Sequence, residues 1–477
     1  MNYGKVVTRF APSPTGFIHV GNVRTALFAF LQARHAGGTF ILRIEDTDKV
    51  REVSGSIERI TESLRWLGID WDEGPGKPGP HAPYLQSERL DTYLKYAWEL
   101  VEKGHAYPDP YTKEEVEMFR KKAETDKRPF LYREHRPTTF ADWDGKGALR
   151  FKVPEIKRYH WHDAVRGDLE AGEEALDDYV LMKGDGYPTY NFAHIVDDVL
   201  MGVTHIMRGE EFISSTPRFL SLYEALGLTP PIFATLPPIL RDDRTKKLGK
   251  RDGAKDILDY REEGFLPEPM VNYLATLGWA PQGSGSDGGE LFSMTDLIRL
   301  FDISKVQKAG AAWNEDKLLW LNKEYLKRLP AETALNSVMI RFKQTGIEPP
   351  RDVLVRALPT LLERISVWSD LDVLIDRGDL TYLVREPNVS SELLGTIKHL
   401  GKVRELLEPV EDWSVDSIKA AVWDFASTTG RADVLAPMRI ALSGLQKSPD
   451  PFMLAYILGK EETLKRLGLA QENKRNI

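Results

Sequence analysis

The 477-residue sequence contains no cysteine. This absence excludes disulfide bonds, and it excludes zinc sites that are built on thiolate ligands. A reducing compartment is compatible with such a composition. We therefore expect a cytoplasmic protein without structural zinc.

Long hydrophobic runs are also missing. No stretch approaches the roughly 18 apolar residues that a membrane-spanning helix requires, so no membrane partner is expected. The first ten residues, MNYGKVVTRF, lack the basic segment followed by an apolar segment that is typical of a secretory signal.

An excess of positive charge is absent from the chain as a whole, whose formal net charge is −8 at pH 7. The total therefore does not indicate a polyanionic partner. It excludes none either, because nucleic-acid binding depends on local basic patches. The sequence has no internal repeat and no low-complexity tract.

The N-terminal segment has the pattern strand, loop, helix, strand. Residues 5–10 (KVVTRF) are rich in β-formers, and apolar residues then follow a helical period from Val23 until Gly37 and Gly38. Residues 39–44 (TFILRI) indicate a buried second strand. Because strands joined through a helix run parallel, we predict an α/β fold with a Rossmann-type parallel sheet.

The pattern changes between about residues 104 and 185. Thr112 and Glu115 have the spacing of a capping box at the start of a charged helix, and the segment KRPFLYREHRP interleaves basic and aromatic residues. From residue 293 onward almost every segment is typical of helices. We expect an α/β region with an inserted α+β region, followed by an all-α C-terminal region.

The stretch RFAPSPTGFIHVG places polar groups around the first predicted helix. Arg9 ends the first strand, His19 and Gly21 precede the helix, and Glu45 ends the second strand. Ligands bind beyond the carboxyl ends of parallel strands, and a helix N-terminus favours phosphate. A surface histidine and a structural ion pair of Arg9 are the simpler alternatives for this motif alone.

A second motif is RDDRTKKLGKR, residues 241–251, with six basic and two acidic residues. The glycine within it favours a loop, and lysine ammonium groups on flexible stems suit a triphosphate. A solvated basic loop is the alternative when this feature is taken alone.

Together these segments resemble a class I aminoacyl-tRNA synthetase of the bacterial glutamyl-tRNA synthetase type. The resemblance rests on RFAPSPTGFIHVG, RIEDTD, YPTYNFAHIVDD, HIMRGEEF and KLGKR, in this order. It continues in LGWAP, KLLWLN and PMRIALSG, so it covers essentially the whole chain.

The resemblance implies ATP-dependent activation of L-glutamate and its transfer to the 3′-terminal adenosine of tRNA-Glu, with release of AMP and pyrophosphate. The HIGH-type signature becomes His19-Val20-Gly21-Asn22, and the KMSKS-type signature becomes Lys247-Leu248-Gly249-Lys250-Arg251. Glycine replaces the usual serine in the latter, which removes a hydroxyl group that could contact a phosphate. The catalytic residues implied are His19, Lys247 and Lys250. The residues implied to bind ATP, with Mg²⁺, are His19, Gly21, Asn22, Glu210, Lys247, Lys250 and Arg251.

The resemblance also implies a glutamate pocket. Arg9 is expected to bind the side-chain carboxylate and Glu45 the α-amino group. The full set implied is Arg9, Ala11, Ser13, Glu45, Tyr190, His194 and Arg208. His194 departs from the asparagine that is common in the family.

The implied domains include two halves of the catalytic region, residues 1–80 and 188–240. The others are an inserted acceptor-stem region (81–187), a stem-contact region (241–325) and a helical anticodon-binding region (326–477). Some relatives hold zinc in the insertion, but this chain has no cysteine to do so. A monomer is expected.

Several alternatives stay open. Arg364 is a candidate for reading the third anticodon base, with a structural ion pair as the alternative. The enzyme could be a non-discriminating form that also charges tRNA-Gln, or an inactive paralogue that only binds tRNA. Glutamyl transfer to a modified base of tRNA-Asp is disfavoured by the helical C-terminal half.

Overall fold

The computed structural model describes residues 4–249, 253–283, 289–387 and 398–475. The chain divides into two compact units. The first comprises Met1–Arg261 and Pro267–Glu315, and the second comprises Glu262–Leu266 and Asp316–Ile477. Within the described ranges, no helix has both the length and the apolar character needed to cross a membrane.

A six-stranded sheet organises the first unit, in the order β2-β1-β8-β9-β5-β6. The first five strands run parallel, and β6 is antiparallel to β5. The prediction of a Rossmann-type parallel sheet is therefore confirmed. The strands are β1 (Val7–Phe10), β2 (Thr39–Leu42), β5 (Tyr159–Asp163), β6 (Gly167–Ala171), β8 (His205–Gly209) and β9 (Ile232–Leu236).

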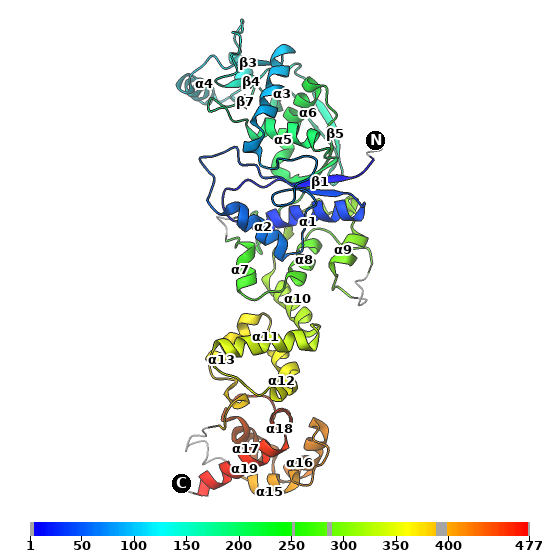
Figure 1. Ribbon diagram of the computed structural model, residues 1–477, viewed down its shortest axis with the longest axis vertical. Coiled ribbons are helices and arrows are strands. Elements are labelled where there is room, and N and C mark those ends of the chain that lie inside the picture. The colour runs from blue at the N-terminus through cyan, green and yellow to red at the C-terminus, as the bar shows by residue number, and fades with distance from the viewer. Residues whose placement is uncertain (1–3, 250–252, 284–288, 388–397, 476–477) are drawn as a thin grey trace. The chain divides into compact units, whose positions relative to one another are not determined.

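Helices cover both faces of this sheet, so that β1 lies between α1 and α5 in Figure 1. On one face α1 packs on the strands and against α8 and α9. On the other face α3, α5 and α6 bury a cluster of apolar side chains over the strands. These helices are α1 (Val20–His35), α3 (Leu90–Glu102), α5 (Tyr190–Leu200), α6 (Thr216–Leu226), α8 (Pro267–Thr276) and α9 (Met294–Leu300).

Local sequence explains the limits of α1. His19 caps its N-terminus, and Gly37, whose φ of +62° lies in the left-handed region, follows its last turn. Most residues between them are buried. The predicted βαβ unit is present, and its first two strands pair in register from Val7 with Thr39 to Phe10 with Leu42.

The chain between β2 and α5 forms a second, smaller sheet. β3 (Ala106–Pro108), β4 (Leu149–Phe151) and β7 (Val180–Met182) are antiparallel. α4 (Lys113–Thr125) begins with the predicted capping box of Thr112 and Glu115. The chain returns to the main sheet as β5 and β6 before residue 187, and the domain boundaries stay predictions.

Shorter elements complete the first unit. α2 (Ser56–Trp66) follows the segment after β2, and α7 (Ile257–Glu262) follows the basic loop. A two-stranded parallel pair joins β10 (Ile239–Leu240) to β11 (Ala311–Ala312).

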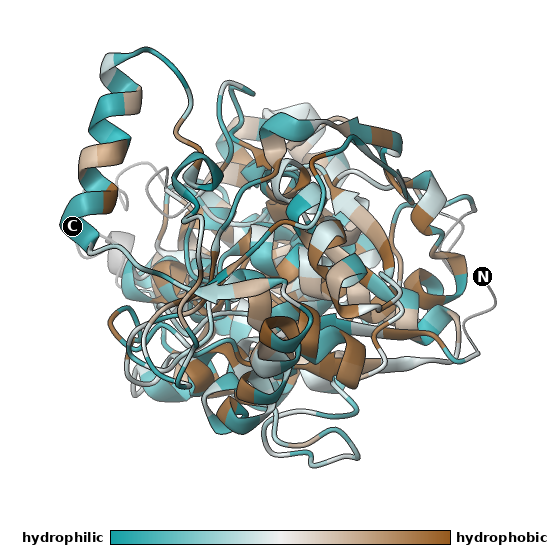
Figure 2. Ribbon diagram, turned by 90° about the horizontal axis from the view of Figure 1, so that it is seen from above, coloured by the Kyte–Doolittle hydropathy of each residue, from teal (hydrophilic) through white to brown (hydrophobic). Residues whose placement is uncertain are grey.

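The second unit is helical throughout its described part, as the sequence predicts. Its helices bury one continuous apolar core. The helices of this unit are α10 (Glu315–Lys327), α11 (Ala331–Gln344), α12 (Arg351–Arg364), α13 (Trp368–Asp376), α15 (Leu400–Leu407), α16 (Val415–Thr429), α17 (Arg431–Ser443), α18 (Pro451–Leu458) and α19 (Lys460–Arg475). Figure 2 colours the whole chain by hydropathy, and helices in that view carry both hydrophobic and hydrophilic residues.

Candidate active site

A cavity of about 480 Å³ opens at the carboxyl ends of β1, β2, β8 and β9. This is the edge of a parallel sheet at which ligands bind. Most of the residues that the sequence predicts for ATP and glutamate line it. They are Arg9, Ala11, Ser13, His19, Gly21, Asn22, Glu45, Tyr190, Arg208, Glu210 and Lys247.

His19 is the N-cap residue of α1. Its Nδ1 accepts a hydrogen bond from the backbone N–H of Gly21 at 3.1 Å, and Asn22 accepts one from the His19 N–H at 3.4 Å. Because Nδ1 is an acceptor, a neutral imidazole carries its proton on Nε2. The residue therefore presents an N–H donor at the end of the helix where backbone dipoles favour an anion.

Gly21 makes room for that imidazole. A Cβ atom at this position would lie 2.9 Å from Cε1 and 3.1 Å from Nδ1 of His19. Any side chain at position 21 would therefore move the histidine ring. The position of the His19 ring is therefore one reason for a glycine at position 21.

The basic loop returns to the same cavity. Lys247 lies on a turn that pairs Leu240 with Lys247, and its Nζ lies 3.1 Å from both carboxylate oxygens of Glu211. The chain after the loop bridges back, with Asp256 opposite His19. His19 and Lys247 thus line one cavity although 228 positions separate them in the sequence. Lys250 and Arg251 lie outside the described residues.

Glu210 and Glu211 begin the 3₁₀ turn that follows β8. Glu210 pairs with Arg166 at 2.9 Å, and Arg166 also donates to the Lys308 carbonyl at 2.8 Å. Both glutamates line the cavity and are about half exposed. Carboxylate oxygens of this kind are ligands that Mg²⁺ accepts.

Arg9 makes a two-pronged contact with Asp198. Its Nε donates to Oδ1 at 3.1 Å and its Nη2 to Oδ2 at 3.2 Å, while Nη1 lies 3.5 Å from the Met207 carbonyl. Asp198 also accepts from Nη1 of Arg43 at 2.7 Å. Burial raises the pKa of Asp198, but Arg43 and Arg9 outweigh burial and hold it at about 2.

Glu45 sits beside this network. It accepts a hydrogen bond from Nη2 of Arg43 at 3.2 Å. Burial raises the pKa of Glu45 to about 7, although Arg43 and Arg9 act to lower it. A cationic group arriving in the cavity would favour the ionised form of this carboxylate.

Arg208 is the most notable charge in the cavity. It is buried, and among the described residues no carboxylate forms an ion pair with it. Its Nη2 donates to the Thr216 hydroxyl at 2.6 Å, its Nε has no hydrogen-bond partner, and burial lowers its pKa to about 10. A buried cation without an anion is costly, so this site favours an anionic ligand.

Tyr190 separates His194 from the cavity. The two rings stack at 4.6 Å with an interplanar angle of 12°, and Nδ1 of His194 bonds the Tyr190 carbonyl at 2.7 Å. Burial lowers the pKa of His194 to about 3, so the ring is neutral at pH 7. His194 does not line the cavity, and its effect on a ligand would pass through Tyr190.

Three further charged residues, which were not predicted from the sequence, organise the site. Arg24 on α1 donates to the carbonyls of Leu277 and Pro237, which ties the helix to the end of β9. Arg43 and Asp198 hold Arg9 and Glu45 as described above. The available signal was a charge inside an apolar element, in TFILRI and in YNFAHIVDDVL.

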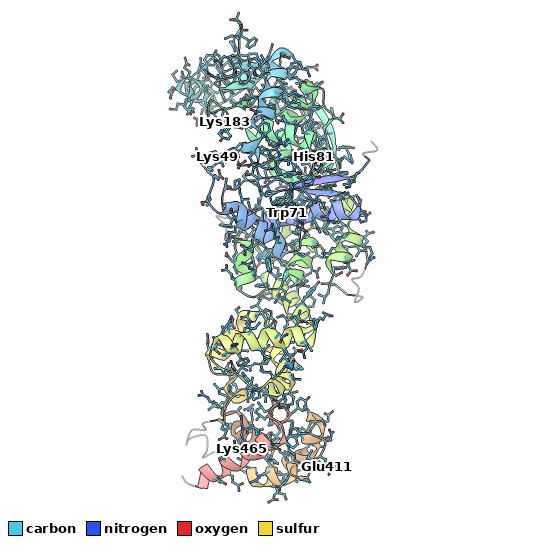
Figure 3. The ribbon with its side chains drawn as sticks, viewed as in Figure 1. Lys49, Trp71, His81, Lys183, Glu411 and Lys465 are labelled. Atoms are coloured by element: carbon cyan, nitrogen blue, oxygen red, sulfur yellow. The ribbon has the colours of Figure 1, made fainter. Side chains whose placement is uncertain are left out.

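The segment after Glu45 is fastened on both sides. Asp46 accepts from the Ser87 N–H at 2.8 Å and pairs with Lys49 at 2.8 Å. Lys183 donates to the Thr47 carbonyl at 3.0 Å. Figure 3 labels Lys49 and Lys183 on the same side of the first unit. These contacts hold the backbone that carries Glu45.

In the second unit, Arg364 is the last residue of α12. Its Nη2 lies 3.8 Å from Oδ2 of Asp379, and its side chain is partly exposed. The structural ion pair that the sequence left as an alternative is thus present. It is long and exposed enough to be weak.

Two family models match the chain. The model described as class I tRNA synthetases (E and Q), catalytic domain, matches residues 5–320, and an anticodon binding domain model matches residues 317–471. Together they span nearly all of the described fold.

Curated relatives match over almost the full length. A glutamate–tRNA ligase of Clostridium botulinum is 40% identical over 481 residues, covering 97% of each chain. One from Myxococcus xanthus is 39% identical over 478 residues, covering 97% of this chain and 98% of its own.

Solved structures agree with these matches. A crystal structure of a glutamate tRNA ligase from Elizabethkingia meningosepticum, in complex with its amino acid, superposes with a TM-score of 0.86 at 35% identity. The match covers 98% of this chain and 99% of the other.

Proposed function

Because the chain belongs to the class I tRNA synthetases of the glutamate and glutamine group, we propose that it is a glutamate–tRNA ligase. It activates L-glutamate with ATP and transfers the glutamyl group to the 3′-terminal adenosine of tRNA-Glu. The observation that carries this proposal is one cavity with two ends. One end has the buried guanidiniums of Arg9 and Arg208 with Glu45, and the other has the α1 N-terminus and Lys247.

The amino-acid end fits glutamate. Arg208 lacks a carboxylate partner among the described residues. Arg9 uses one N–H each of Nε, Nη1 and Nη2 for Asp198 and Met207, and its remaining N–H groups can bind a ligand. A substrate with a second carboxylate would supply the anion that this end of the cavity lacks. A guanidinium group can bind a carboxylate with two parallel hydrogen bonds. Glu45, once ionised, would accept the α-ammonium group.

The other end fits a triphosphate. The Nε2–H of His19 and the positive end of the α1 dipole suit phosphate oxygens. Lys247 rests on an exposed carboxylate, and an ion pair of this kind is worth less than about 1 kcal/mol, so the lysine can leave it for a phosphate. Lys250 and Arg251 remain proposed ATP ligands by resemblance.

Activation requires no general base. The α-carboxylate of glutamate is already ionised, and its oxygen attacks the α-phosphorus of ATP while the bond to pyrophosphate breaks. His19 and Lys247 would stabilise the charge that develops on the phosphates. Mg²⁺, for which Glu210 offers carboxylate oxygens, supplies further charge neutralisation when it is bound with ATP.

Transfer completes the reaction. The 2′-hydroxyl of the terminal adenosine attacks the carbonyl carbon of glutamyl-adenylate, and AMP leaves. We assign the acceptor end to residues 81–187, the stem to 241–325 and the anticodon to 326–477, with Arg364 as one candidate contact. The match of residues 317–471 to an anticodon binding domain supports the last of these. A cytoplasmic monomer completes the proposal by resemblance.

The test is aminoacylation with purified tRNA-Glu and tRNA-Gln side by side. Charging of tRNA-Glu alone identifies a discriminating enzyme, and charging of both identifies a non-discriminating one. If tRNA binds but neither is charged, and ATP–pyrophosphate exchange with tRNA present is also absent, the chain is a binding paralogue and the proposal is wrong.

Arg208 gives the test at the level of one residue. Arg208→Met removes the charge with similar side-chain length, and we expect kcat/KM for glutamate to fall about a hundredfold or more, because a carboxylate loses a charge-assisted partner worth roughly 3 kcal/mol. The KM for ATP should change little. A normal KM for glutamate would remove Arg208 from the amino-acid end.

A further inference from the structure

We propose that Asp198 and Arg43 are positioning residues that hold Arg9 and Glu45 at a set spacing, and that this spacing selects an amino acid of the length of glutamate over aspartate. The inference rests on the proposed function, in which Arg9 binds the side-chain carboxylate and Glu45 the α-ammonium group. Neither positioning residue needs to touch the substrate.

Asp198 fixes the direction of the Arg9 guanidinium. The contact uses the Nε and Nη2 edge, at 3.1 and 3.2 Å, and the Asp198 side chain is fully buried. Arginine has several rotatable bonds, and a bidentate partner limits the freedom of its planar head group. The N–H groups of Arg9 that remain for a ligand therefore lie on the edge of the guanidinium that does not face Asp198.

Arg43 continues the same network to Glu45. Its Nη1 lies 2.7 Å from Asp198 and its Nη2 lies 3.2 Å from Glu45, and its side chain has no solvent exposure. Arg9, Asp198, Arg43 and Glu45 thus form one continuous chain of charge-assisted contacts. Arg9 and Glu45, the two groups proposed to bind the ends of the amino acid, are the first and last members of this chain of contacts.

The parallel pairing of β1 and β2 determines the backbone positions of Arg9 and Arg43. Arg9 lies opposite Ile41 in the parallel register of β1 and β2, and the Arg43 N–H donates to the Phe10 carbonyl at 3.0 Å. The arginines therefore approach Asp198 from neighbouring strands. Main-chain hydrogen bonds determine this spacing before any side chain acts.

Asp197 anchors the helix that carries Asp198. It accepts from Arg89 at 2.7 Å, from Gln86 at 2.8 Å and from the Tyr93 hydroxyl at 2.8 Å. All of these side chains are buried. The position of Asp198 is therefore fixed by α5 and, through the hydrogen bonds of Asp197, by the start of α3 and the residues just before it.

A fixed spacing distinguishes two acids that differ by one methylene. Aspartate can reach Arg9 or Glu45, but its shorter side chain leaves the other group without its contact to the substrate, so aspartate gains less binding energy. If Arg9 could turn freely, it would follow the shorter side chain. We therefore expect selection to weaken when the Asp198 or Arg43 contact is removed.

A pH profile reports the Arg43 contact separately. The charged and titratable groups that act on or around Glu45 are Arg43 beside it, Arg9 from β1, and Asp198 and Tyr190 from α5. Arg43 is the cation that bonds Glu45 directly. Without this charge, ionisation of Glu45, and with it binding of the ammonium group, would require a higher pH.

The experiment measures kcat and KM for aminoacylation with glutamate and with aspartate between pH 6 and pH 8.5. The variants are Asp198→Asn, Arg43→Met and Arg43→Lys. Asp178→Asn is the matched control, since Asp178 is a buried carboxylate that pairs with Arg136 at 2.6 Å outside the cavity. Thermal unfolding of each variant separates stability from selection.

For Asp198→Asn we expect KM for glutamate to rise about tenfold with a smaller change in kcat, and the preference for glutamate over aspartate to fall about tenfold. Arg43→Met should move the pH midpoint of KM for glutamate upward, and Arg43→Lys should restore the midpoint while selection stays weakened. Asp178→Asn should lower stability without changing either.

Three results would overturn the inference. The first is an unchanged preference for glutamate in both Asp198→Asn and Arg43→Lys, and the second is an unmoved pH midpoint in Arg43→Met. The third is an equal loss of preference in the Asp178→Asn control, which would reduce Asp198 and Arg43 to a structural role. If wild-type protein fails to charge tRNA with glutamate, the proposed function fails instead, so the two failures are distinguishable.

Discussion

Lys247 rests on Glu211, with Nζ 3.1 Å from both carboxylate oxygens. Both side chains are about half exposed, at 51% and 52%. Such a pair contributes little to stability. The contact therefore holds the Lys247 ammonium group at the cavity only weakly. A weakly held lysine can move with the negative charge as it shifts during a reaction.

Lys247→Ala should lower kcat for glutamyl-adenylate formation about a hundredfold, because a cation at the developing pyrophosphate is worth roughly 2.7 kcal/mol in sites of this kind. Affinity for tRNA should change much less. Pyrophosphate exchange with tRNA present and a tRNA-binding assay measure the two quantities. Loss confined to tRNA binding would reassign this lysine.

Glu211→Gln is the matched control for that prediction. It removes the resting partner but keeps the side-chain size, so Lys247 stays available. We expect kcat within about threefold of wild type, since an exposed ion pair is worth less than about 1 kcal/mol.

Gly21→Ala should reduce activity without reducing stability. The added Cβ would lie 2.9 Å from Cε1 of His19 and displace its ring, whereas alanine is a better helix former than glycine by up to about 1 kcal/mol. Steady-state kinetics for ATP and thermal unfolding check the two halves of this prediction.

A double-mutant cycle then tests the cause. If Gly21 matters because it seats His19, the double variant His19→Ala and Gly21→Ala should be no less active than His19→Ala alone. Additive losses would show that position 21 acts independently, for example through the approach of a ligand to the backbone.

His194 should make the protein sensitive to acid. Burial lowers its pKa from 6.5 in the unfolded chain to about 3. Between pH 6.5 and pH 3, His194 is therefore protonated in the unfolded state and neutral in the folded state. Stability from this group is present above pH 6.5 and is lost as the pH falls toward 3. At pH 5 the loss relative to pH 8 is about 2 kcal/mol.

His194→Asn should remove that part of the pH dependence, because asparagine does not titrate. Chemical denaturation of both proteins at pH 5 and pH 8 measures the difference, and groups common to both cancel. Equal acid sensitivity in the two proteins would mean that His194 is not the source.

Metal analysis of the purified protein should find no stoichiometric zinc. The chain has no thiolate ligand, and within the described ranges no group of three or more histidine, aspartate or glutamate side chains is placed to hold a metal. Activity lost in EDTA should return with Mg²⁺ alone. A requirement for zinc would contradict the composition argument.

Local pattern was enough to determine several features of this protein. The alternation of strand and helix before residue 44 predicted the parallel sheet, the motif around His19 predicted the start of α1, and the helical periodicity after residue 293 predicted the second unit. These succeed because periodicity and capping act within a few residues of the chain.

Tertiary structure alone decided which charges meet. Arg9 binds Asp198 from 189 residues away, Lys247 pairs with Glu211, and His194 packs behind Tyr190 instead of facing the cavity. The sequence shows each of these charges but not its partner. Partners depend on strand order, on register and on which face of a helix is buried, and these arise only when distant segments share one core.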